Sequence, residues 1–386
     1  MSIPVNTAVP QDFSHFERVP CNICGSNETA LVLQKWNYHI VRCVECGLVY
    51  VNPRGFRVEA DDYFEGIYLS TIEKQGQLDP GIATLYSDIL YNIGNRVPMG
   101  KLLDVGCAMG HFLAFAKRYG WEVEGVECSP FAARYASQQV GVKVHPVCVL
   151  KDANLTKDFY NSCVLVEVIE HLADPRETMT EVWRLLEPGG LAYVTTPNFA
   201  SYRSLLLREE WEPVIPVGHL YYFDAVSLGN LLTSVGFINV ENLSGEAEFA
   251  EDLEFARNSG LLKLSPQELD QVKELARADD VRGPNNGRGE GLIMCARKPW
   301  DSSHQQSAYS ERIPRQAFKQ NFAGCLVRRP GETPEDQKVY YVENGRKRWV
   351  TTAEWIIAKG MRWPEDVQLV TAEELDAILT GPPLPD

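Results

Sequence analysis

The sequence lacks a hydrophobic run long enough to cross a membrane, and its first 17 residues carry no basic side chain. A membrane-spanning helix needs about 18 or more apolar residues in succession, and a secretory signal begins with a positively charged segment. We therefore expect a cytoplasmic protein with no membrane span. Internal repeats and low-complexity blocks are also absent.

Positive charge is scarce. The 386 residues include 37 Lys plus Arg against 52 Asp plus Glu, which gives a formal net charge of −15. Because a negative protein is repelled by a phosphate backbone, nucleic acid is an unfavourable partner and a small molecule is a better one. Hydrophobic residues make up 45% of the chain, enough for two or three domains with cores of their own.

Ten cysteines are present, and four of them form two matched pairs. Cys21 and Cys24 precede Gly25, while Cys43 and Cys46 precede Gly47. Two thiolates three positions apart on a tight turn can share one tetrahedral ion. Four sulfurs leave no position for water, so the pattern favours a structural zinc ion over a catalytic one. A redox pair and a ribbon that has lost its metal are the alternatives.

Short apolar runs alternate with helical segments from about residue 101 to residue 298. The runs predict buried strands, and they lie at 102–105, 123–126, 163–166, 191–194 and 292–296. Ser129-Pro130 and Asp174-Pro175 each combine an N-cap residue with a proline in the first turn of a helix. This alternation predicts a parallel sheet covered by helices.

Changes in composition divide the chain further. We expect a flexible arm at 1–15, a zinc ribbon at 16–56, a helical lid or linker at 57–98, an α/β domain at 99–298, a linker at 299–312 and a small α+β module at 313–386. In the last segment, Asn344-Gly345 between two apolar runs predicts a β-hairpin, and Thr351 and Thr371 each begin a capping box.

The turn after the first strand of the α/β domain contains Asp104, Gly106 and Gly110. A dinucleotide site would have Gly-x-Gly-x-x-Gly at this point, whereas here the glycines are four positions apart and an acid precedes them. The turn therefore suits a ligand with cationic groups better than a pyrophosphate. Glu127 closes the next strand, where a carboxylate can accept both hydroxyl groups of a ribose.

Together these motifs resemble the class I S-adenosylmethionine-dependent methyltransferases. The resemblance covers roughly residues 99–298 and includes Glu167-Val168-Ile169-Glu170-His171-Leu172 and Leu186-Glu187-Pro188-Gly189-Gly190-Leu191. The cysteine-paired module is similar to the ribbon that often precedes such domains in bacteria. The resemblance implies a Rossmann-like seven-stranded sheet and S-adenosylmethionine as cofactor.

Carried over to this sequence, the resemblance also implies a set of cofactor-binding residues. Asp104, Gly106 and Gly110 would flank the methionine part, residues 148–152 would border the adenine, and Glu167 would lie near the sulfonium. The full set is Asp104, Gly106, Cys107, Gly110, Glu127, Cys128 and Glu167. Two positions depart from the family pattern. Ala108 replaces the second glycine of the turn, so we expect an ordinary backbone conformation there, and Asn161 replaces an aspartate.

An oxygen acceptor needs a group that takes its proton, and three residues are candidates. Glu170 and His171 follow the fourth strand, and His219 lies in an aromatic segment after the fifth. The alternative for either histidine is a packing or capping role.

The sequence thus predicts methyl transfer to a small-molecule acceptor, with an oxygen of a sugar or a secondary metabolite as the leading choice. The sugar can be nucleotide-linked or part of a surface glycan. A sugar C-methyltransferase, an RNA methyltransferase and an inactive binding or scaffold relative are the alternatives. The C-terminal module is a candidate contact for a homodimer or a protein partner.

Overall fold

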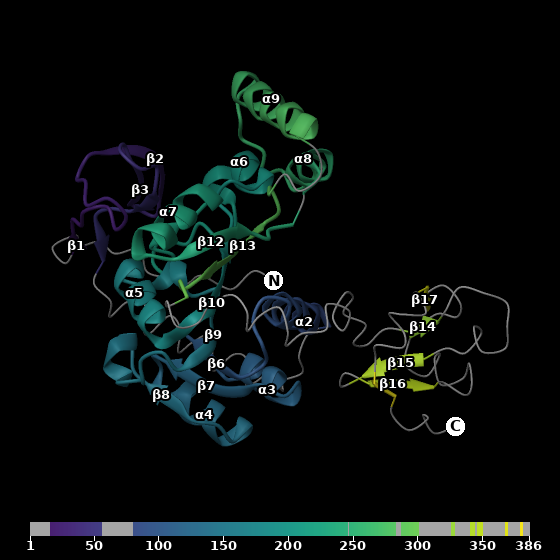
Figure 1. The fold of residues 1–386 in the computed structure, drawn as a ribbon. Coiled ribbons are helices and arrows are strands. Elements are labelled where there is room, and N and C mark those ends of the chain that lie inside the picture. Colours follow the sequence, from purple (N-terminus) through teal and green to yellow (C-terminus); the bar gives the residue numbers. More distant parts are fainter. Residues whose placement is uncertain are drawn as a thin grey trace. The chain divides into compact units, whose positions relative to one another are not determined.

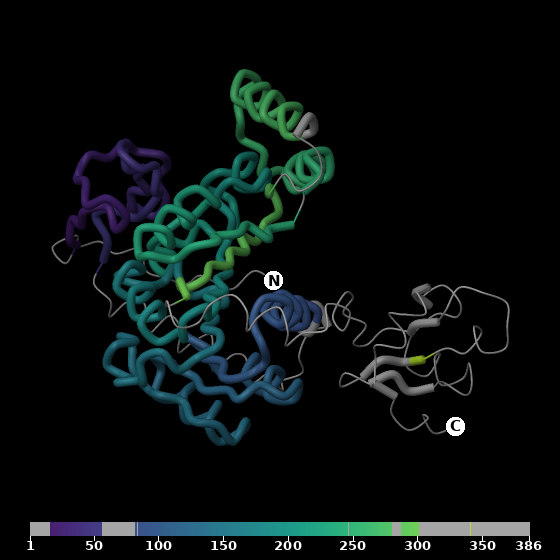
Figure 2. Tube along the Cα trace, in the orientation of Figure 1, coloured from purple at the N-terminus to yellow at the C-terminus, as the bar shows by residue number. Residues whose placement is uncertain are grey.

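We analysed a computed structural model of the chain (Figures 1 and 2). The structure describes residues 16–55, 80–245, 247–282 and 287–300, together with the strand residues 326–328, 340–343, 346–349, 367–369 and 379–380. Contacts divide the chain into two compact units, 1–77 with 101–110 and 124–299, and 78–100 with 111–123 and 300–386. The predicted arm at 1–15 and most of the predicted linker at 299–312 lie outside the described residues.

A seven-stranded mixed sheet organises the α/β domain, and its strand order is β12-β13-β10-β9-β6-β7-β8. The strands are β6 (Lys101–Val105), β7 (Glu122–Glu127), β8 (Val144–Pro146), β9 (Tyr160–Val166), β10 (Leu186–Pro197), β12 (Ile238–Asn242) and β13 (Gly291–Arg297). β13 runs antiparallel to β10, whereas β9 is parallel to both β6 and β10. The predicted Rossmann-like seven-stranded sheet is therefore confirmed, and the order reverses between β6 and β9.

Helices connect these strands. The first unit contains α4 (Pro130–Val140), α5 (Pro175–Leu185), α6 (Tyr202–Leu207), α7 (Ala225–Val235), α8 (Phe249–Asn258) and α9 (Pro266–Arg282), with short 3₁₀ turns η1 (Leu150–Ala153), η2 (Ile169–His171) and η3 (Arg208–Glu210). The predicted caps are present, because the Ser129 and Asp174 side chains accept hydrogen bonds from the first turns of α4 and α5.

One buried cluster joins the sheet to the cysteine-paired segment. Leu103, Leu165 and Val194 from the sheet belong to the same cluster as Cys43 and Tyr50. The segment at 16–55 therefore packs as part of the first unit.

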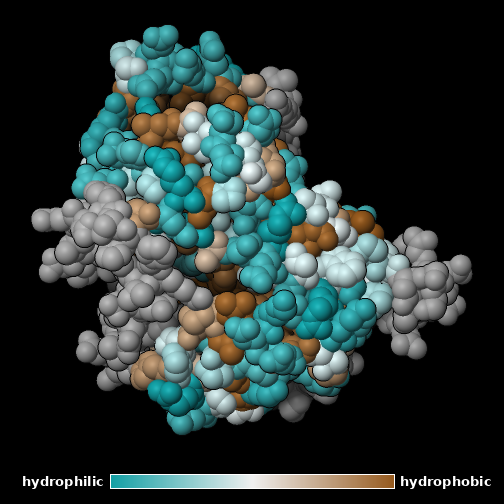
Figure 3. All heavy atoms as spheres, turned by 90° about the vertical axis from the view of Figure 1, so that its left-hand side faces the viewer, coloured by the Kyte–Doolittle hydropathy of each residue, from teal (hydrophilic) through white to brown (hydrophobic). Residues whose placement is uncertain are grey.

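On the face drawn in Figure 3, hydrophobic residues form separate patches within a largely hydrophilic surface.

The cysteine-paired segment is built of short strands, β1 (Phe16–Glu17), β2 (Thr29–Lys35), β3 (Tyr38–Cys43), β4 (Val49–Val51) and β5 (Arg54–Gly55). β1 pairs with β5, and β2, β3 and β4 form an antiparallel sheet. A fourth strand, β11 (Tyr221–Tyr222), extends this sheet by pairing with β4. The ribbon sheet therefore includes a strand from the α/β domain.

The second unit contains α2 (Pro80–Gly94), α3 (His111–Arg118) and a five-stranded sheet. Tyr86 of α2 packs against Phe112 and Phe115 of α3, with ring centroids 5.2 and 5.7 Å apart. The predicted helices between residues 56 and 79 lie outside the described residues.

The five-stranded sheet consists of β14 (Leu326–Arg328), β15 (Tyr340–Glu343), β16 (Arg346–Trp349), β17 (Val367–Leu369) and β18 (Leu379–Thr380). β15 and β16 pair antiparallel with Glu343 opposite Arg346, as the hairpin prediction requires. The two capping boxes and the turn residues fall outside the described residues. Among the residues that the structure does describe, no helix is both long and apolar enough to cross a membrane.

Candidate active site

A cavity of about 700 Å³ lies at the carboxyl ends of β6, β7 and β9, where the strand order of the sheet reverses. This is where open α/β sheets bind ligands, and the volume is typical of small-molecule sites. Gly106, Glu127 and Glu167 from the predicted set line it. Cys128 and the catalytic candidate His171 line it as well.

The geometry of the turn after β6 explains why glycine occupies positions 106 and 110. Gly106 has φ +80°, and a Cβ atom there would lie 2.6 Å from a methyl carbon of Val168, so only glycine fits without displacing that side chain. A Cβ atom on Gly110 would lie 2.8 Å from Ala136 of α4. Gly110 therefore permits close helix packing and is not on the cavity surface.

The expectation of an ordinary conformation at Ala108 is wrong. Ala108 has φ +47°, in the left-handed region that usually costs a non-glycine residue about 1–2 kcal/mol. This conformation accompanies a hydrogen bond from the Ala108 amide to Oε2 of Glu127 at 2.9 Å. Alanine has the smallest side chain after glycine, and the bond to a buried carboxylate offsets part of the backbone cost.

Glu127 occupies the end of β7 with only 4% of its surface exposed. Its carboxylate also accepts a hydrogen bond from the Ser129 amide at 2.8 Å, so both of its oxygens are held in place. Beneath the turn, burial and the nearby Glu127 raise the pKa of Asp104 to about 8. Asp104 is therefore largely protonated at neutral pH, and the negative potential expected from it is weaker than the sequence suggested.

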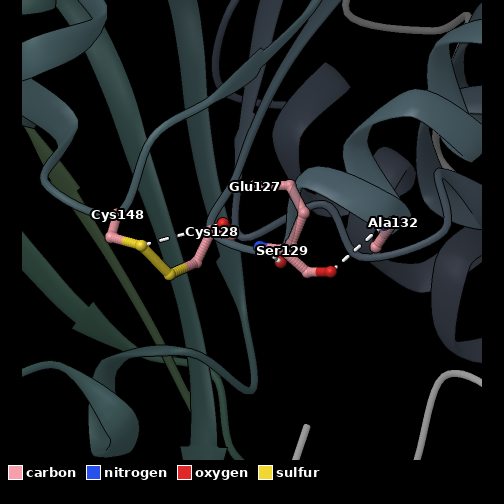
Figure 4. Close-up of a disulfide and its surroundings, with 5 residues drawn as sticks. All are labelled: Glu127, Cys128, Ser129, Ala132 and Cys148. Carbon is pink, nitrogen blue, oxygen red and sulfur yellow. Dashed lines mark hydrogen bonds between the residues drawn. A yellow bond between two sulfur atoms is a disulfide. The ribbon is translucent and has the colours of Figure 1, made fainter. Parts of the chain in front are cut away.

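A disulfide between Cys128 and Cys148 crosses the rim of the cavity (Figure 4). Cys128 directly follows Glu127, and Cys148 lies in the segment 147–150 that lines the side predicted for adenine. The bond thus ties the end of β7 to that segment. No sequence pattern predicts this bond, since the two cysteines are isolated residues separated by 20 positions.

Replacing Cys148 by serine should lower the free energy of unfolding by about 2–4 kcal/mol, because the open chain regains the entropy that the cross-link removes. Denaturant titration of the oxidised wild type and the variant measures the difference. Adding a reductant should lower the free energy of unfolding of the wild type to that of the variant and leave the value for the variant unchanged. A wild type whose stability does not respond to the reductant would argue against the bond.

Glu167 and Glu170 follow β9 with different surroundings. Glu167 lines the cavity, and its Oε1 accepts a hydrogen bond from the Thr195 hydroxyl at 2.8 Å. Glu170 lies deeper, only 1% exposed, and its Oε2 accepts a hydrogen bond from the Thr196 hydroxyl at 2.9 Å. Among the described residues, its Oε1 has no hydrogen-bond partner. Burial, reinforced by the charge of Glu167, raises the pKa of Glu170 well above its ordinary value.

His171 and His219 lie together beside Glu170. Their ring centroids are 4.6 Å apart, and Nε2 of His171 is 3.8 Å from Oε1 of Glu170. Nδ1 of His171 is 2.9 Å from the Gly218 carbonyl, which makes Nδ1 the protonated nitrogen of the neutral ring. Burial lowers the pKa of both rings, that of His219 to about 3, so both are neutral near pH 7.

The structure thus brings the three catalytic candidates together, although only His171 contributes to the cavity lining. Glu170 lies behind His171, and His219 packs on its ring. The ligand atoms of these three residues lie within 4.8 Å of one another, close enough to hold a metal ion. Asp104 and Cys107 are buried and are not part of the lining surface.

A second cluster with the composition of a metal site consists of the four predicted cysteines, Cys21, Cys24, Cys43 and Cys46. Sγ of Cys21 is 3.3 Å from Sγ of Cys46, and Sγ of Cys24 is 3.4 Å from Sγ of Cys43. All four sulfurs lie within 4.8 Å of one another, and none is in a disulfide.

The two cysteine loops have the same backbone pattern. The amides of Gly25 and Gly47 donate to the carbonyls of Cys21 and Cys43, at 2.8 and 3.0 Å. Both glycines have positive φ, +75° and +81°. Matched loops that present four sulfurs to one point fit a tetrahedral metal ion.

The fold and the site define a class of protein. A sheet with this strand order, a tight glycine turn after β6, an acid closing β7 and a cavity at the strand ends are the features of a class I S-adenosylmethionine-dependent methyltransferase. Residues 76–242, less than half of the chain, match the family model described as a methyltransferase domain.

Curated relatives include the ubiquinone biosynthesis O-methyltransferase of Cereibacter sphaeroides, 30% identical over 117 residues, or 29% of this chain and 47% of the relative. The enzyme of the same name from Aeromonas salmonicida is 25% identical over 156 residues, or 38% of this chain and 65% of the relative. The chain spans about half to two thirds of the length of these relatives.

Solved structures that the chain matches include phosphoethanolamine N-methyltransferase 2 of Haemonchus contortus, with a TM-score of 0.45 and 19% identity over 64% of this chain and 62% of that chain. An S-adenosylmethionine-dependent methyltransferase from Archaeoglobus fulgidus has a TM-score of 0.42 and 18% identity over 60% of this chain and 99% of that chain.

Proposed function

We propose that the protein transfers a methyl group from S-adenosylmethionine to a hydroxyl oxygen of a small molecule, such as a sugar or a secondary metabolite. The observation that carries the proposal is the cavity at the strand ends, which collects Gly106, Glu127, Glu167 and His171 from the ends of three strands. Methyl transfer from a sulfonium needs little more than alignment of the reacting atoms and exclusion of water.

The cofactor would be held by the residues at the ends of β6, β7 and β9, and it supplies an electrophilic methyl group. The Glu127 carboxylate is placed to accept the ribose hydroxyls, and the segment 147–150 forms an apolar wall for the adenine. The backbone at Gly106 offers a close approach without a side chain. Glu167 contributes a carboxyl group on the same surface.

Glu170 and His171 are proposed as the proton acceptor for the hydroxyl. Because Nδ1 of His171 donates to Gly218, Nε2 carries the lone pair that can take a proton. The resulting imidazolium would be stabilised by the nearby Glu170 carboxylate, 3.8 Å away. His219 is a positioning residue in this scheme, since its ring fixes the orientation of His171.

We further propose that Cys21, Cys24, Cys43 and Cys46 bind one structural zinc ion. The mutual proximity of the four sulfurs and the matched loops support this assignment. The ion would hold together a segment of short strands, a size at which a metal often replaces a larger core.

Substituting alanine for Glu127 should weaken S-adenosylmethionine binding by about 1–3 kcal/mol, since ribose hydroxyls and two backbone amides lose their acceptor. Isothermal calorimetry measures the change, and Glu127→Gln, which keeps one acceptor oxygen, should lose less. Unchanged affinity in the alanine variant would place the ribose elsewhere.

The proposed activity is tested by incubating the full chain with S-adenosylmethionine and pooled metabolites, with release of S-adenosylhomocysteine as the readout. Acceptor-dependent release is expected, and mass spectrometry then identifies the methylated product. Product methylated at carbon, or methylation of RNA alone, would contradict the proposal.

A further inference from the structure

The cavity is not built from the α/β domain alone. Glu17, Tyr38, Arg54 and Gly55 of the ribbon segment line it together with Glu127 and His171. These four ribbon residues lie on β1, β3 and β5. The ribbon is therefore a wall of the same space that the cofactor would share with its acceptor.

Backbone hydrogen bonds connect this wall to the proposed proton acceptor. The Val51 amide, at the end of β4, donates to the Leu220 carbonyl at 2.9 Å. The Leu220 amide in turn donates to the Glu170 carbonyl at 2.8 Å. Because each link is a main-chain contact, the position of the ribbon and that of Glu170 depend on each other.

Arg54 adds a side-chain connection. Its guanidinium donates to Oε1 of Glu17 at 3.0 Å within the ribbon, and to the Ala173 carbonyl of the α/β domain at 2.8 Å. Ala173 lies two residues beyond His171. Arg54 is 13% exposed at its side chain, so it is held in this bridging position with little contact with solvent.

The charges on the cavity wall restrict the acceptor. Among the described lining residues, five carboxyl side chains accompany one guanidinium, that of Arg54; the acids are Glu17, Glu127, Glu167, Asp174 and Glu177. The guanidinium is already paired with Glu17. Within the part of the lining that the structure describes, a phosphate or carboxylate on the acceptor would meet like charges without an uncommitted cation, which disfavours its binding. Leu172, Val217 and Leu220 provide apolar surface in the same space.

Building on the proposed function, we propose that the ribbon forms one wall of the acceptor site, with Glu17 and Arg54 as specificity-determining residues. The acceptor is an uncharged hydroxylated molecule that packs on the apolar wall. The carboxyl groups of the described lining disfavour nucleotide-linked and phosphorylated acceptors. The ribbon is thus part of the substrate-binding apparatus as well as a folding unit.

A matched pair of probes tests this assignment on the full chain saturated with S-adenosylhomocysteine. 4-Methylcatechol is uncharged, 3,4-dihydroxybenzoate is anionic, and ligand-observed NMR gives a Kd for each. We expect the wild type to bind the uncharged probe at least about tenfold more tightly. Glu17→Lys should strengthen binding of the anionic probe by about tenfold, because it reverses one charge on the ribbon wall.

Glu28→Lys is the matched control, since Glu28 is an exposed acid of the same ribbon that does not line the cavity. It should leave both Kd values unchanged, and zinc content should be equal in all three proteins. The inference is overturned if the wild type binds the anionic probe as well as the uncharged one, if it binds neither, or if both lysine variants behave alike. Failure to bind S-adenosylhomocysteine would instead reject the proposed function, so the two failures are distinguishable.

Discussion

Glu170→Gln is expected to lower kcat by about 10²- to 10⁴-fold, the usual contribution of a positioned proton acceptor. The amide keeps the shape of the side chain and the bond to Thr196, but it cannot balance a positive charge on His171. Single-turnover measurement of S-adenosylhomocysteine formation isolates the chemical step, and calorimetry should show normal cofactor affinity. Wild-type turnover by the variant would remove Glu170 from the mechanism.

The pH dependence gives the same prediction a second readout. The reaction needs ionised Glu170, so activity is present above the pKa of this group and is lost as the pH falls through it. Because burial raises that pKa above its ordinary value, the loss should begin at a higher pH than for an exposed carboxylate. Thr196→Val removes a hydrogen bond that lowers the pKa of Glu170. This substitution should therefore shift the acid side of the pH–rate profile to higher pH and leave the maximal rate close to that of the wild type.

The second large effect is expected for Cys43→Ser, which should release zinc and unfold the ribbon. Cys43 is fully buried among the other three cysteines, and structural zinc contributes on the order of 10 kcal/mol to the folding of small metal-binding modules. Mass spectrometry of the purified protein should find one zinc per chain in the wild type and almost none in the variant.

Cys163→Ala is the control, because Cys163 is a buried cysteine of β9 outside the metal-binding group. It should retain the ion. A Cys43→Ser protein that keeps its full zinc content would contradict the four-thiolate assignment. The ribbon wall also predicts that zinc loss weakens acceptor binding more than cofactor binding, since Arg54 and Glu17 belong to the ribbon and Glu127 does not.

The strands and their caps were predictable because their signals are local. The apolar runs at β6, β9 and β13 and the N-cap residues Ser129 and Asp174 each depend on a few neighbouring positions. Glu127 and Glu167 could be placed in the cavity for a related reason. Parallel strands bring their carboxyl ends to the same edge, so the end of a strand specifies the location of a side chain.

Long-range contacts were not predictable from these patterns. Tyr50 pairs with Tyr221 across about 170 positions, and strands of three and two residues, such as β4 and β11, are too short to carry a periodic signal. The contribution of Arg54 to the cavity also involves a distant contact, with the Ala173 carbonyl. The bond between Cys128 and Cys148 and the left-handed backbone at Ala108 are likewise set by tertiary contacts. Sequence reasoning therefore placed Glu127 and Glu167 at the cavity and missed the ribbon residues that also line it.

A crystal structure of the full chain with S-adenosylmethionine tests the central claim most directly. The account predicts one molecule in the cavity at the ends of β6, β7 and β9, its ribose hydroxyls on the Glu127 carboxylate and its adenine beside residues 147–150. A donor bound elsewhere, or a phosphate-bearing ligand seated in the turn at Gly106, would contradict it.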